Sequence, residues 1–397
     1  MKQYGLIGKN LTYSYSKLIH DFIIKKYNLE ASYNLIQKGS ISKDLLLSYD
    51  GLNITIPYKE AVLEYLDSHS MPLVSCNTIT NIQGRLFGNN TDRIGFDYLV
   101  KKIKAHHVKK VLILGSGGSS KMIQEYFHNK EVIVISRSDK VYNYDYLKHC
   151  KADILINATP IGMNSFESPV KEDYLKNFKM VIDLNYNPIN SKLALQTKKI
   201  GHRFIGGLDM LIVQALASNQ IWHGITFDSN DIQEIREYLL MKTCDKIALI
   251  GMPLAGKSTL VKEFGGVDLD DTIVSQYQED IPSLLKNGLF RNYESVLLKQ
   301  LVEENTKLIA LGGGAILNHY NLELLKDYLI IFLDEDLEVL KSRYQEGIRP
   351  LLTNIEALET LYTKRYPLYT AYANIQGDGQ TIKQLLEEWT LNENRIN

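Results

Sequence analysis

Short apolar runs alternate with longer segments of helical spacing along most of the chain, which is the pattern of an α/β protein. Four runs are apolar on both faces and are predicted to be buried parallel strands: Lys110–Leu114, Val132–Ile135, Asp153–Asn157 and Met180–Leu184. Another apolar run, Lys246–Gly251, lies well past the middle of the chain. We therefore predict an α/β fold with at least two separate sheets.

The chain begins with a predicted strand, Tyr4–Gly8, and a helix whose apolar stripe spans Leu18–Ile23. Ser14 and Ser16 lie just before this helix. Hydroxyl groups at the start of a helix either cap it or bind an anion, and the residues alone favour capping.

A second strand of this region carries Asn53 and Thr55 on one face, because strand side chains alternate. Pro57 ends the strand, and Lys59 falls in the first turn of the next helix. A lysine at that position opposes the helix dipole, so a purely structural design would avoid it. Lys59 is therefore a candidate functional residue.

A hairpin is predicted around Asn81–Gly84, which precedes a second short apolar segment. Asp92 follows the hairpin and comes before a helix that we expect to begin near Gly95. The aspartate is equally suited to capping that helix and to a functional role, so the residues alone leave both interpretations open.

A glycine-rich loop joins the strand Lys110–Leu114 to a helix, as in dinucleotide-binding folds. An NAD site places a carboxylate about 20 residues further on, but here an arginine between two serines follows the strand Val132–Ile135, which suits the 2′-phosphate of NADP. Ser120 replaces the third glycine of the fingerprint, so simple turn chemistry is the alternative. The predicted NADP contacts are Gly115, Ser116, Gly117, Gly118, Ser119, Ser136, Arg137 and Ser138.

The phosphate-binding spacing G-x-x-x-x-G-K-S runs from Gly251 to Ser258, with a strand before it and a helical pattern after it. Glycine lets backbone N–H groups turn toward phosphate oxygens, Lys257 adds a positive charge, and the Ser258 hydroxyl can bind Mg²⁺. The alternative is a chance match in a glycine-bearing turn. We predict an ATP-binding loop that opens a separate α/β domain.

The composition of the chain narrows the class of protein. The chain has 397 residues, enough for two or three domains, and its formal net charge of −1 argues against a general nucleic-acid or membrane-surface protein. No apolar run reaches the length of a membrane span, and the first residues lead into a strand rather than a signal peptide. Three cysteines without metal spacing indicate reduced thiols, so we expect a cytoplasmic protein.

The part of the chain before the phosphate loop resembles shikimate dehydrogenase. The motifs that carry this resemblance are Ser14–Ser16, Asn53–Lys59, Asn77-Thr78, Asn90–Asp92, Gly115–Gly118, Asn157–Met163, Asp183–Pro188 and Gly207–Gln214. The resemblance implies NADPH-dependent reduction of 3-dehydroshikimate to shikimate in a two-lobed fold, with an α/β substrate lobe and a Rossmann NADP lobe. It makes Lys59 and Asp92 the acid–base pair and places Leu184 and Gly207 at the nicotinamide. The substrate contacts that it implies are Ser14, Ser16, Thr55, Asn77, Asp92, Tyr186 and Gln214.

The chain from the phosphate loop to about residue 375 resembles shikimate kinase, a P-loop protein with a parallel sheet like that of nucleoside monophosphate kinases. The matching motifs are Asp268–Asp270, Phe290–Glu294, Leu308–Ala315, Ile348–Leu352 and Arg365–Tyr369. The resemblance implies phosphorylation of shikimate by ATP with Mg²⁺, with Asp270 and Lys257 as catalytic residues. The ATP contacts that it implies are Leu254, Ala255, Gly256, Lys257, Ser258, Thr259 and Arg349. The implied shikimate contacts are Asp270, Arg291, Gly313, Gly314 and Arg365, and the implied Mg²⁺ contacts are Ser258 and Asp268.

Together these features predict a bifunctional enzyme of the shikimate pathway. The substrate lobe is expected over residues 1–95, with 206–241 packing back on it, the NADP lobe over 96–205 and the kinase domain over 245–397. The hydroxyl that hydride transfer creates would be the one that is phosphorylated, which gives the fusion a chemical reason. Only small-molecule partners are expected, with neither nucleic acid nor a membrane.

Three departures from the two families bear on this prediction. Lys17 stands where dehydrogenases usually have proline, Leu254 stands where kinases usually have glycine, and the helix after Lys257 is short. The main alternative is therefore an active dehydrogenase with a weak or regulatory kinase-like domain. Two further alternatives are an NAD-linked quinate dehydrogenase, which Arg137 disfavours, and a non-enzymatic scaffold that binds nucleotides.

Overall fold

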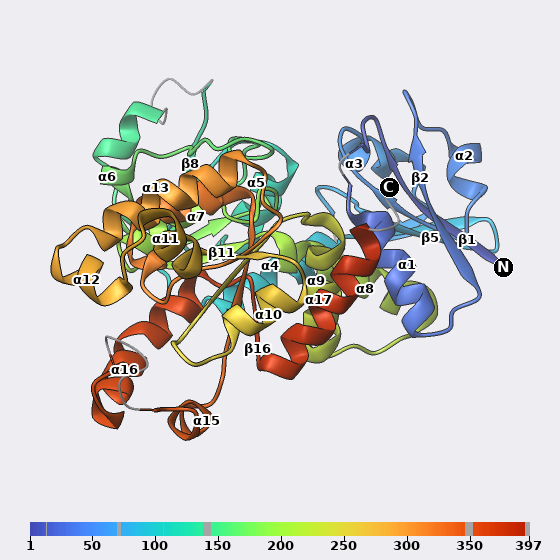
Figure 1. The fold of residues 1–397 in the computed structure, drawn as a ribbon. Coiled ribbons are helices and arrows are strands. Elements are labelled where there is room, and N and C mark those ends of the chain that lie inside the picture. The colour runs from blue at the N-terminus through green and yellow to red at the C-terminus, as the bar shows by residue number, and fades with distance from the viewer. Residues whose placement is uncertain (13, 70–72, 106, 138–143, 346–351, 394–397) are drawn as a thin grey trace. The chain divides into compact units, whose positions relative to one another are not determined.

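The computed structural model describes residues 1–397 apart from 13, 70–72, 106, 138–143, 346–351 and 394–397 (Figure 1). The chain forms two compact units, one containing Met1–Tyr186 and Ile200–Leu239, the other Asn187–Lys199 and Leu240–Asn397. The described residues form three β-sheets, and helices alternate with the strands along the chain, so the predicted α/β fold is confirmed. Within the described ranges, no helix combines the length and the apolar character that crossing a membrane requires.

The first sheet has six strands in the order β2-β1-β3-β5-β6-β4. The predicted hairpin joins β5 to β6, where Gln83 and Gly84 have φ values of 53° and 80°, as a two-residue type I′ turn requires. The strands are β1 (Lys2–Gly8), β2 (Ala31–Gln37), β3 (Gly51–Ile54), β4 (Ser68–His69), β5 (Thr78–Ile82) and β6 (Arg85–Asn89). The helices are α1 (Ser16–Lys26), α2 (Lys43–Leu47), α3 (Tyr58–Ala61) and η1 (Val62–Tyr65).

The buried face of α1 is more polar than the predicted apolar stripe. His20 is buried there and stacks on Tyr33 of β2, with 3.8 Å between the ring centroids. Burial lowers the pKa of His20 to about 3, so its imidazole is neutral at physiological pH. Lys17 lies on the same helix and donates to the Tyr33 carbonyl at 2.9 Å and to Asp21, which gives this departure from the dehydrogenase motif a structural role.

The second sheet has five parallel strands in the order β11-β10-β9-β7-β8, and four of them, all but β11, are the strands predicted from apolar runs. These strands are β7 (Lys110–Leu114), β8 (Glu131–Ile135), β9 (Ala152–Asn157), β10 (Phe178–Asp183) and β11 (Arg203–Gly206). The helices of this region are α4 (Thr91–Lys102), α5 (Gly118–Tyr126), η2 (Tyr144–Lys148), α6 (Glu172–Leu175), α8 (Leu208–His223) and α9 (Ser229–Thr243). Helix α7 (Lys192–Lys199) belongs to the other unit.

Helix α4 begins at Thr91, so the start expected near Gly95 is wrong. The Thr91 N–H donates to the side-chain oxygen of Asn77 at 2.7 Å, which satisfies a buried donor of the first turn from outside the helix. Further along, helices α4, α8 and α9 are joined at buried Asp209, which accepts from Lys102 and Arg236, each at 2.6 Å. Short sequence motifs do not predict these contacts of Asn77 and Asp209, because each joins residues that are well separated along the chain.

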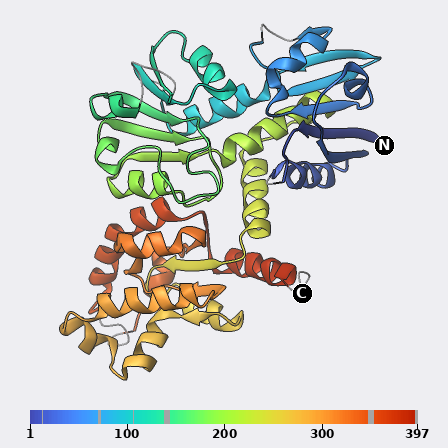
Figure 2. The same ribbon diagram turned by 90° about the horizontal axis from the view of Figure 1, so that it is seen from above.

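The third sheet is parallel, in the order β13-β14-β12-β15-β16, with helices on both of its faces (Figure 2). Its strands are β12 (Ile247–Gly251), β13 (Val267–Asp268), β14 (Leu308–Ala310), β15 (Leu329–Leu333) and β16 (Ile375–Gly377). The α-helices are α10 (Lys257–Glu263), α11 (Leu269–Tyr277), α12 (Ile281–Lys286), α13 (Phe290–Glu303), α14 (His319–Leu324), α15 (Leu337–Ser342), α16 (Ile355–Tyr372) and α17 (Gly379–Glu393). Two single-turn 3₁₀ segments are η3 (Ala315–Leu317) and η4 (Leu325–Asp327). Helix α10 has only 7 residues, as its sequence suggested.

Candidate active sites

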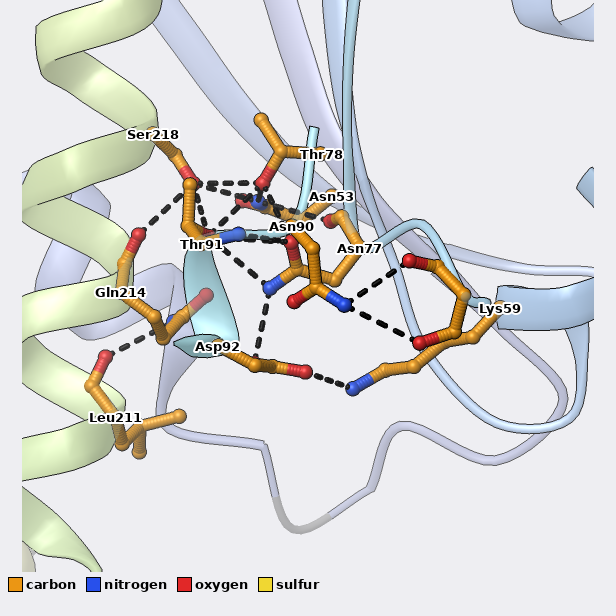
Figure 3. Close-up of polar contacts among 11 residues, drawn as sticks. Asn53, Lys59, Asn77, Thr78, Asn90, Thr91, Asp92, Leu211, Gln214 and Ser218 are labelled. Atoms are coloured by element: carbon orange, nitrogen blue, oxygen red, sulfur yellow. Dashed lines mark hydrogen bonds and ion pairs between the residues drawn. The ribbon is translucent and has the colours of Figure 1, made fainter. Parts of the chain in front are cut away.

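Lys59 and Asp92 form an ion pair in the first unit, with 2.6 Å between Nζ and Oδ2 (Figure 3). Lys59 comes from the short helix α3 and Asp92 from the first turn of α4. The second oxygen of Asp92 accepts from the Asn77 amide at 2.9 Å. Both ionic side chains are mostly buried, at 22% and 16% exposure, so their attraction is screened less than that of a surface pair.

Asp92 therefore pairs with Lys59 rather than capping α4. The N-cap residue of α4 is Asn90, which makes no side-chain cap bond and instead donates to the Ser75 carbonyl at 2.9 Å. A carboxylate in the first turn interacts favourably with the helix dipole, so this position of Asp92 suits α4 as well as the ion pair. The capping interpretation of Asp92 is therefore wrong, and its functional role stays a prediction.

The predicted substrate residues lie at the ends of neighbouring elements. Ser14 accepts from the Ser16 N–H at 3.2 Å, while the N-cap of α1, Tyr15, makes no side-chain cap bond. The Tyr15 ring contacts the ring of Tyr186, with 5.3 Å between centroids, so Tyr186 adjoins the start of α1. The Ser14 hydroxyl therefore accepts the N–H of the first residue of α1, as the capping interpretation expects, although the N-cap residue itself is Tyr15.

Two further predicted substrate residues border this region. Thr55 directly follows β3, and its N–H donates to the Ile7 carbonyl of β1 at 2.9 Å, so it lies at the carboxyl ends of these strands. Gln214 is a buried residue of α8 whose amide donates to the Leu211 carbonyl at 2.9 Å (Figure 3). The roles of both residues in binding remain predictions.

The glycine loop after β7 has the shape that a pyrophosphate needs. Gly115 has a φ of 104°, and an added Cβ would lie 3.0 Å from the Ala158 carbonyl oxygen, so glycine is required there. At Gly117 and Gly118, by contrast, an added Cβ would meet no other atom within 4 Å. Open space beside the N-terminus of α5 is suited to an anion, so the residues present fit a dinucleotide.

Other predicted NADP contacts surround the same sheet edge. Ser116 belongs to the glycine loop, and Ser119 lies in the first turn of α5. Ser136 and Arg137 follow β8, whereas Ser138 lies outside the described residues. Gly207 is the N-cap residue of α8, and a Cβ there would overlap the Leu184 carbonyl oxygen. This contact places Leu184 and Gly207 side by side, as the predicted nicotinamide site requires.

A cavity of about 260 Å³ in the second unit collects most of the predicted kinase residues. It is lined by residues that include Leu254, Gly256, Lys257, Ser258, Thr259, Asp268, Asp270, Arg291, Gly313, Gly314 and Arg365. Ala255 is buried within the phosphate loop, and Arg349 lies outside the described residues. The other predicted residues come from five separate stretches of sequence, and the fold brings them to one space.

The phosphate loop between β12 and α10 requires left-handed backbone at three residues. Gly251, Leu254 and Gly256 have φ values of 152°, 72° and 100°. Two of these are glycines, which adopt such values without strain, but leucine pays a steric penalty there. Lys257 is held inside the loop by hydrogen bonds to the carbonyls of Gly251 and Met252, at 3.0 and 2.9 Å.

We expect Leu254→Gly to stabilise the second unit. The left-handed conformation costs leucine about 1–2 kcal/mol, and glycine loses about 0.5–1 kcal/mol more backbone entropy on folding, so a net gain of about 0.5–1 kcal/mol remains. Chemical unfolding of the full chain measures this gain. Gly256→Ala is the matched reverse change at a φ of 100° and should destabilise the same unit. A less stable Leu254→Gly protein would contradict the strain.

The glycine run after β14 explains how the substrate side chains converge. A Cβ at Gly312 would overlap Asp270, one at Gly313 would lie 2.9 Å from an Arg365 nitrogen, and one at Gly314 would overlap the Arg291 guanidinium. Each glycine thus leaves room for one charged side chain. Gly312 belongs to the kinase motif Leu308–Ala315 but is not among the predicted site residues. Its place in a run of three glycines could have indicated this close approach.

Glu294 is a further residue of this cavity, and its motif alone does not predict a role for it. It is fully buried and accepts from Arg291 with both carboxylate oxygens, each at 2.8 Å. Burial raises the pKa of the Glu294 carboxyl to about 7, although the neighbouring Arg291 charge opposes the shift. The carboxyl group therefore changes charge near neutral pH.

We expect the KM for shikimate in the phosphorylation reaction to rise as the pH increases through about 7. Below this value Glu294 is neutral and leaves the Arg291 charge for a substrate carboxylate, whereas above it the Glu294 anion neutralises that charge. Initial rates at pH 6 and pH 8 measure the change. Glu294→Gln should remove most of it, and an unchanged profile in that variant would contradict the assignment.

Asp268, one of the two predicted Mg²⁺ contacts, also forms a hydrogen bond within the fold. One of its oxygens accepts from the Asp271 N–H at 3.1 Å and caps α11. No cluster of three or more histidine, cysteine, aspartate or glutamate side chains suited to a metal occurs among the described residues. A nucleotide-bound Mg²⁺ needs only one or two protein ligands, so Ser258 and Asp268 at one cavity fit such an ion.

Comparison with known proteins identifies both parts of the chain. Residues 6–79 match the shikimate dehydrogenase substrate binding domain, and residues 253–390 match shikimate kinase. "Shikimate dehydrogenase (NADP(+))" of Clostridium perfringens is 33% identical over 270 residues, covering 60% of this chain and 98% of that protein.

Two solved structures extend this similarity. A chorismate mutase/shikimate 5-dehydrogenase fusion protein from Clostridium acetobutylicum is 33% identical with a TM-score of 0.56, covering 60% of this chain and 97% of that one. Shikimate 5-dehydrogenase from Thermus thermophilus, in complex with NADP(H) and shikimate, is 26% identical with a TM-score of 0.54, covering 59% and 98%. Both resemblances drawn from the motifs are confirmed. The chain belongs to the shikimate dehydrogenase family and carries a shikimate kinase domain after its dehydrogenase part.

Proposed function

We propose that this chain reduces 3-dehydroshikimate to shikimate with NADPH and then phosphorylates shikimate with ATP and Mg²⁺. The observation that carries the two-step proposal is the cavity of the second unit, where the phosphate loop meets Asp270, Arg291 and Arg365. A dehydrogenase alone has no use for a phosphate loop beside two arginines and an aspartate.

In the reduction, the Lys59–Asp92 pair would manage the proton. NADPH supplies a hydride when bound, and the carbonyl that accepts it becomes an alkoxide. The ammonium of Lys59 is the donor for that oxygen, and Asp92, 2.6 Å away, orients it and stabilises its charge. The glycine loop with Arg137 would hold the dinucleotide, and Leu184 and Gly207 would border its nicotinamide.

In the second step, the charged groups of the cavity would divide between the two substrates. Arg291 and Arg365 would bind the shikimate carboxylate, and Asp270 would orient the attacking hydroxyl. Lys257 and Arg349 would neutralise the charge of the transferring phosphoryl group, while Ser258 and Asp268 would hold Mg²⁺.

The division of labour along the chain is also part of the proposal. The substrate lobe would comprise residues 1–95 with 206–241, the NADP lobe 96–205 and the kinase domain 245–397. Cytoplasmic residence is proposed as well, because Cys76, Cys150 and Cys244 are all free.

A coupled assay tests the whole proposal. The full chain would receive 3-dehydroshikimate, NADPH, ATP and Mg²⁺, and products would be identified by mass. Shikimate 3-phosphate is the expected product, and it should not form when either nucleotide is omitted. Accumulation of shikimate without phosphate would instead favour the regulatory kinase-like domain, and equal kcat/KM values with NADH would contradict the cofactor assignment.

A further inference from the structure

A buried cluster of polar side chains lies directly behind Asn77 and Asp92, and neither the family motifs nor the mechanism above gives it a role (Figure 3). We call it the hydroxyl cluster, and its members are Asn53, Thr78, Thr91 and Ser218. They come from β3, β5, α4 and α8, and none is more than 4% exposed. Buried polar groups destabilise a fold unless they are hydrogen-bonded, so the arrangement of donors and acceptors is constrained.

The cluster is assembled by simple register. Asn53 lies directly opposite Thr78 in the antiparallel pairing of β3 with β5. Thr78 follows Asn77 in sequence, and Thr91 precedes Asp92. Each site residue thus has a neighbour whose hydroxyl lies in the buried cluster rather than at the ion pair.

The direction of the Asn77 amide is fixed by its partners. The Thr91 N–H can only donate, and it lies 2.7 Å from one side-chain atom of Asn77, which must therefore be the oxygen. The amide nitrogen then donates to Asp92 at 2.9 Å and to the Thr91 hydroxyl at 3.0 Å. If this amide were reversed, its oxygen would face the Asp92 carboxylate, and Asp92 would lose a donor.

The rest of the cluster supports the same direction. Ser218 donates to the Gln214 carbonyl at 2.9 Å, so its oxygen serves as an acceptor for Asn53 at 2.9 Å and for a threonine hydroxyl. The Thr91 hydroxyl accepts from Asn77, so its own proton is left for a neighbour, and Ser218 lies 3.2 Å away. The Thr91 hydroxyl also lies 3.0 Å from the Thr78 hydroxyl and 3.2 Å from the Asn77 oxygen. A contiguous set of hydrogen bonds, with more than one possible order of donors, therefore links Asn77 through Thr91 and Ser218 to the backbone of α8.

We propose that Thr91 and Ser218 are positioning residues for the reduction, because their hydroxyl groups help to hold the Asn77 amide in the orientation that donates to Asp92. This inference rests on the proposed dehydrogenase activity. Without the Thr91 hydroxyl, the Asn77 nitrogen keeps Asp92 as an acceptor but loses its second one, so the amide is held less firmly against Asp92. Asp92 then orients Lys59 less well, and misplacement of a catalytic group by a fraction of an ångström lowers the rate.

Thr91→Val and Thr91→Ser form the matched pair that tests this inference. Valine keeps the shape and removes the hydroxyl, whereas serine keeps the hydroxyl and removes the methyl group. We expect Thr91→Val to lower kcat for shikimate oxidation by about tenfold to a hundredfold, and Thr91→Ser to stay within about threefold of the parent. Both variants would be assayed as full chains, well below their thermal unfolding midpoints.

The outcomes are distinguishable. Equal losses in both variants, or a Thr91→Val protein with a lower unfolding midpoint and an unchanged kcat, would show a merely structural role and overturn the inference. If Thr91→Val does not fold, Ser218→Ala is assayed against the same criterion, with a tenfold lower kcat expected. If the parent chain itself fails to oxidise shikimate, the proposed function fails, whereas variants at the parent rate defeat only the positioning role.

Discussion

Replacing Lys257 by methionine is expected to abolish phosphorylation of shikimate and to leave reduction of 3-dehydroshikimate nearly intact. Lys257 is buried at the start of α10, lines the cavity and is held by two loop carbonyls, so its charge is positioned for phosphate. Removing a preorganised charge from a phosphoryl-transfer site lowers kcat by about 10²–10³-fold or more. Product mass measures one activity and NADPH absorbance the other, in the same protein sample.

Lys262→Met is the matched control for this experiment. Lys262 lies on the same helix, but its side chain is 65% exposed and pairs with Asp271 at the surface. Surface pairs contribute little, so this variant should retain both activities. Parallel loss of reduction and phosphorylation in Lys257→Met would mean that the two sites are not independent, and it would contradict the proposal.

The fold could be predicted from the sequence where local signals are strong. Four of the five strands of the second sheet are short apolar runs, the pattern of strands that are buried in a parallel sheet. The loop from Gly251 to Ser258 could also be predicted, because glycine, lysine and serine at that spacing are typical of a phosphate-binding loop. The strain at Leu254 was visible only as a departure from glycine, and the structure gives it a φ of 72°.

The candidate sites were less predictable where contacts between residues far apart in the sequence determine the position of a side chain. Asp92 had the local sequence of a helix cap, and only its approach to Lys59, 33 residues away, shows its partner. Asn53 and Ser218 are separated by 165 residues, and no periodic pattern connects them. Glu294 belongs to the kinase motif Phe290–Glu294, but the spacing of that motif does not predict that its carboxylate is fully buried against Arg291.

The two sites also differ in how charge is used. In the first unit, one lysine and one carboxylate neutralise each other, so the pocket can polarise a substrate without holding net charge. In the second unit, Arg291, Arg365 and Lys257 line one cavity with Asp268, Asp270 and Glu294. The acidic groups balance the basic ones there too, so the three cationic side chains, rather than a net charge of the cavity, suit the shikimate carboxylate and the ATP phosphates.

Replacing Lys59 by methionine is expected to lower kcat for 3-dehydroshikimate reduction by about 10²–10⁴-fold, the usual contribution of a general acid or base. Phosphorylation of added shikimate should persist, so the variant is the mirror image of Lys257→Met. Methionine preserves the length of the side chain but not its proton or charge, and Asp92 is left without its 2.6 Å partner. NADPH consumption and phosphorylated product measure the two activities.

Lys43→Met provides the control, because Lys43 forms an exposed ion pair with Asp67 at 3.2 Å in the same unit. It should reduce 3-dehydroshikimate at the parent rate. A non-enzymatic scaffold predicts that Lys59→Met and Lys43→Met behave alike in every assay, so equal rates for the two variants would contradict the acid–base role. Because phosphorylation reports only on the second unit, the unfolding transition of the first unit must also match that of the parent. A large loss confined to Lys59→Met in a normally folded protein then indicates that this ammonium acts at the reacting carbonyl or holds the groups that do.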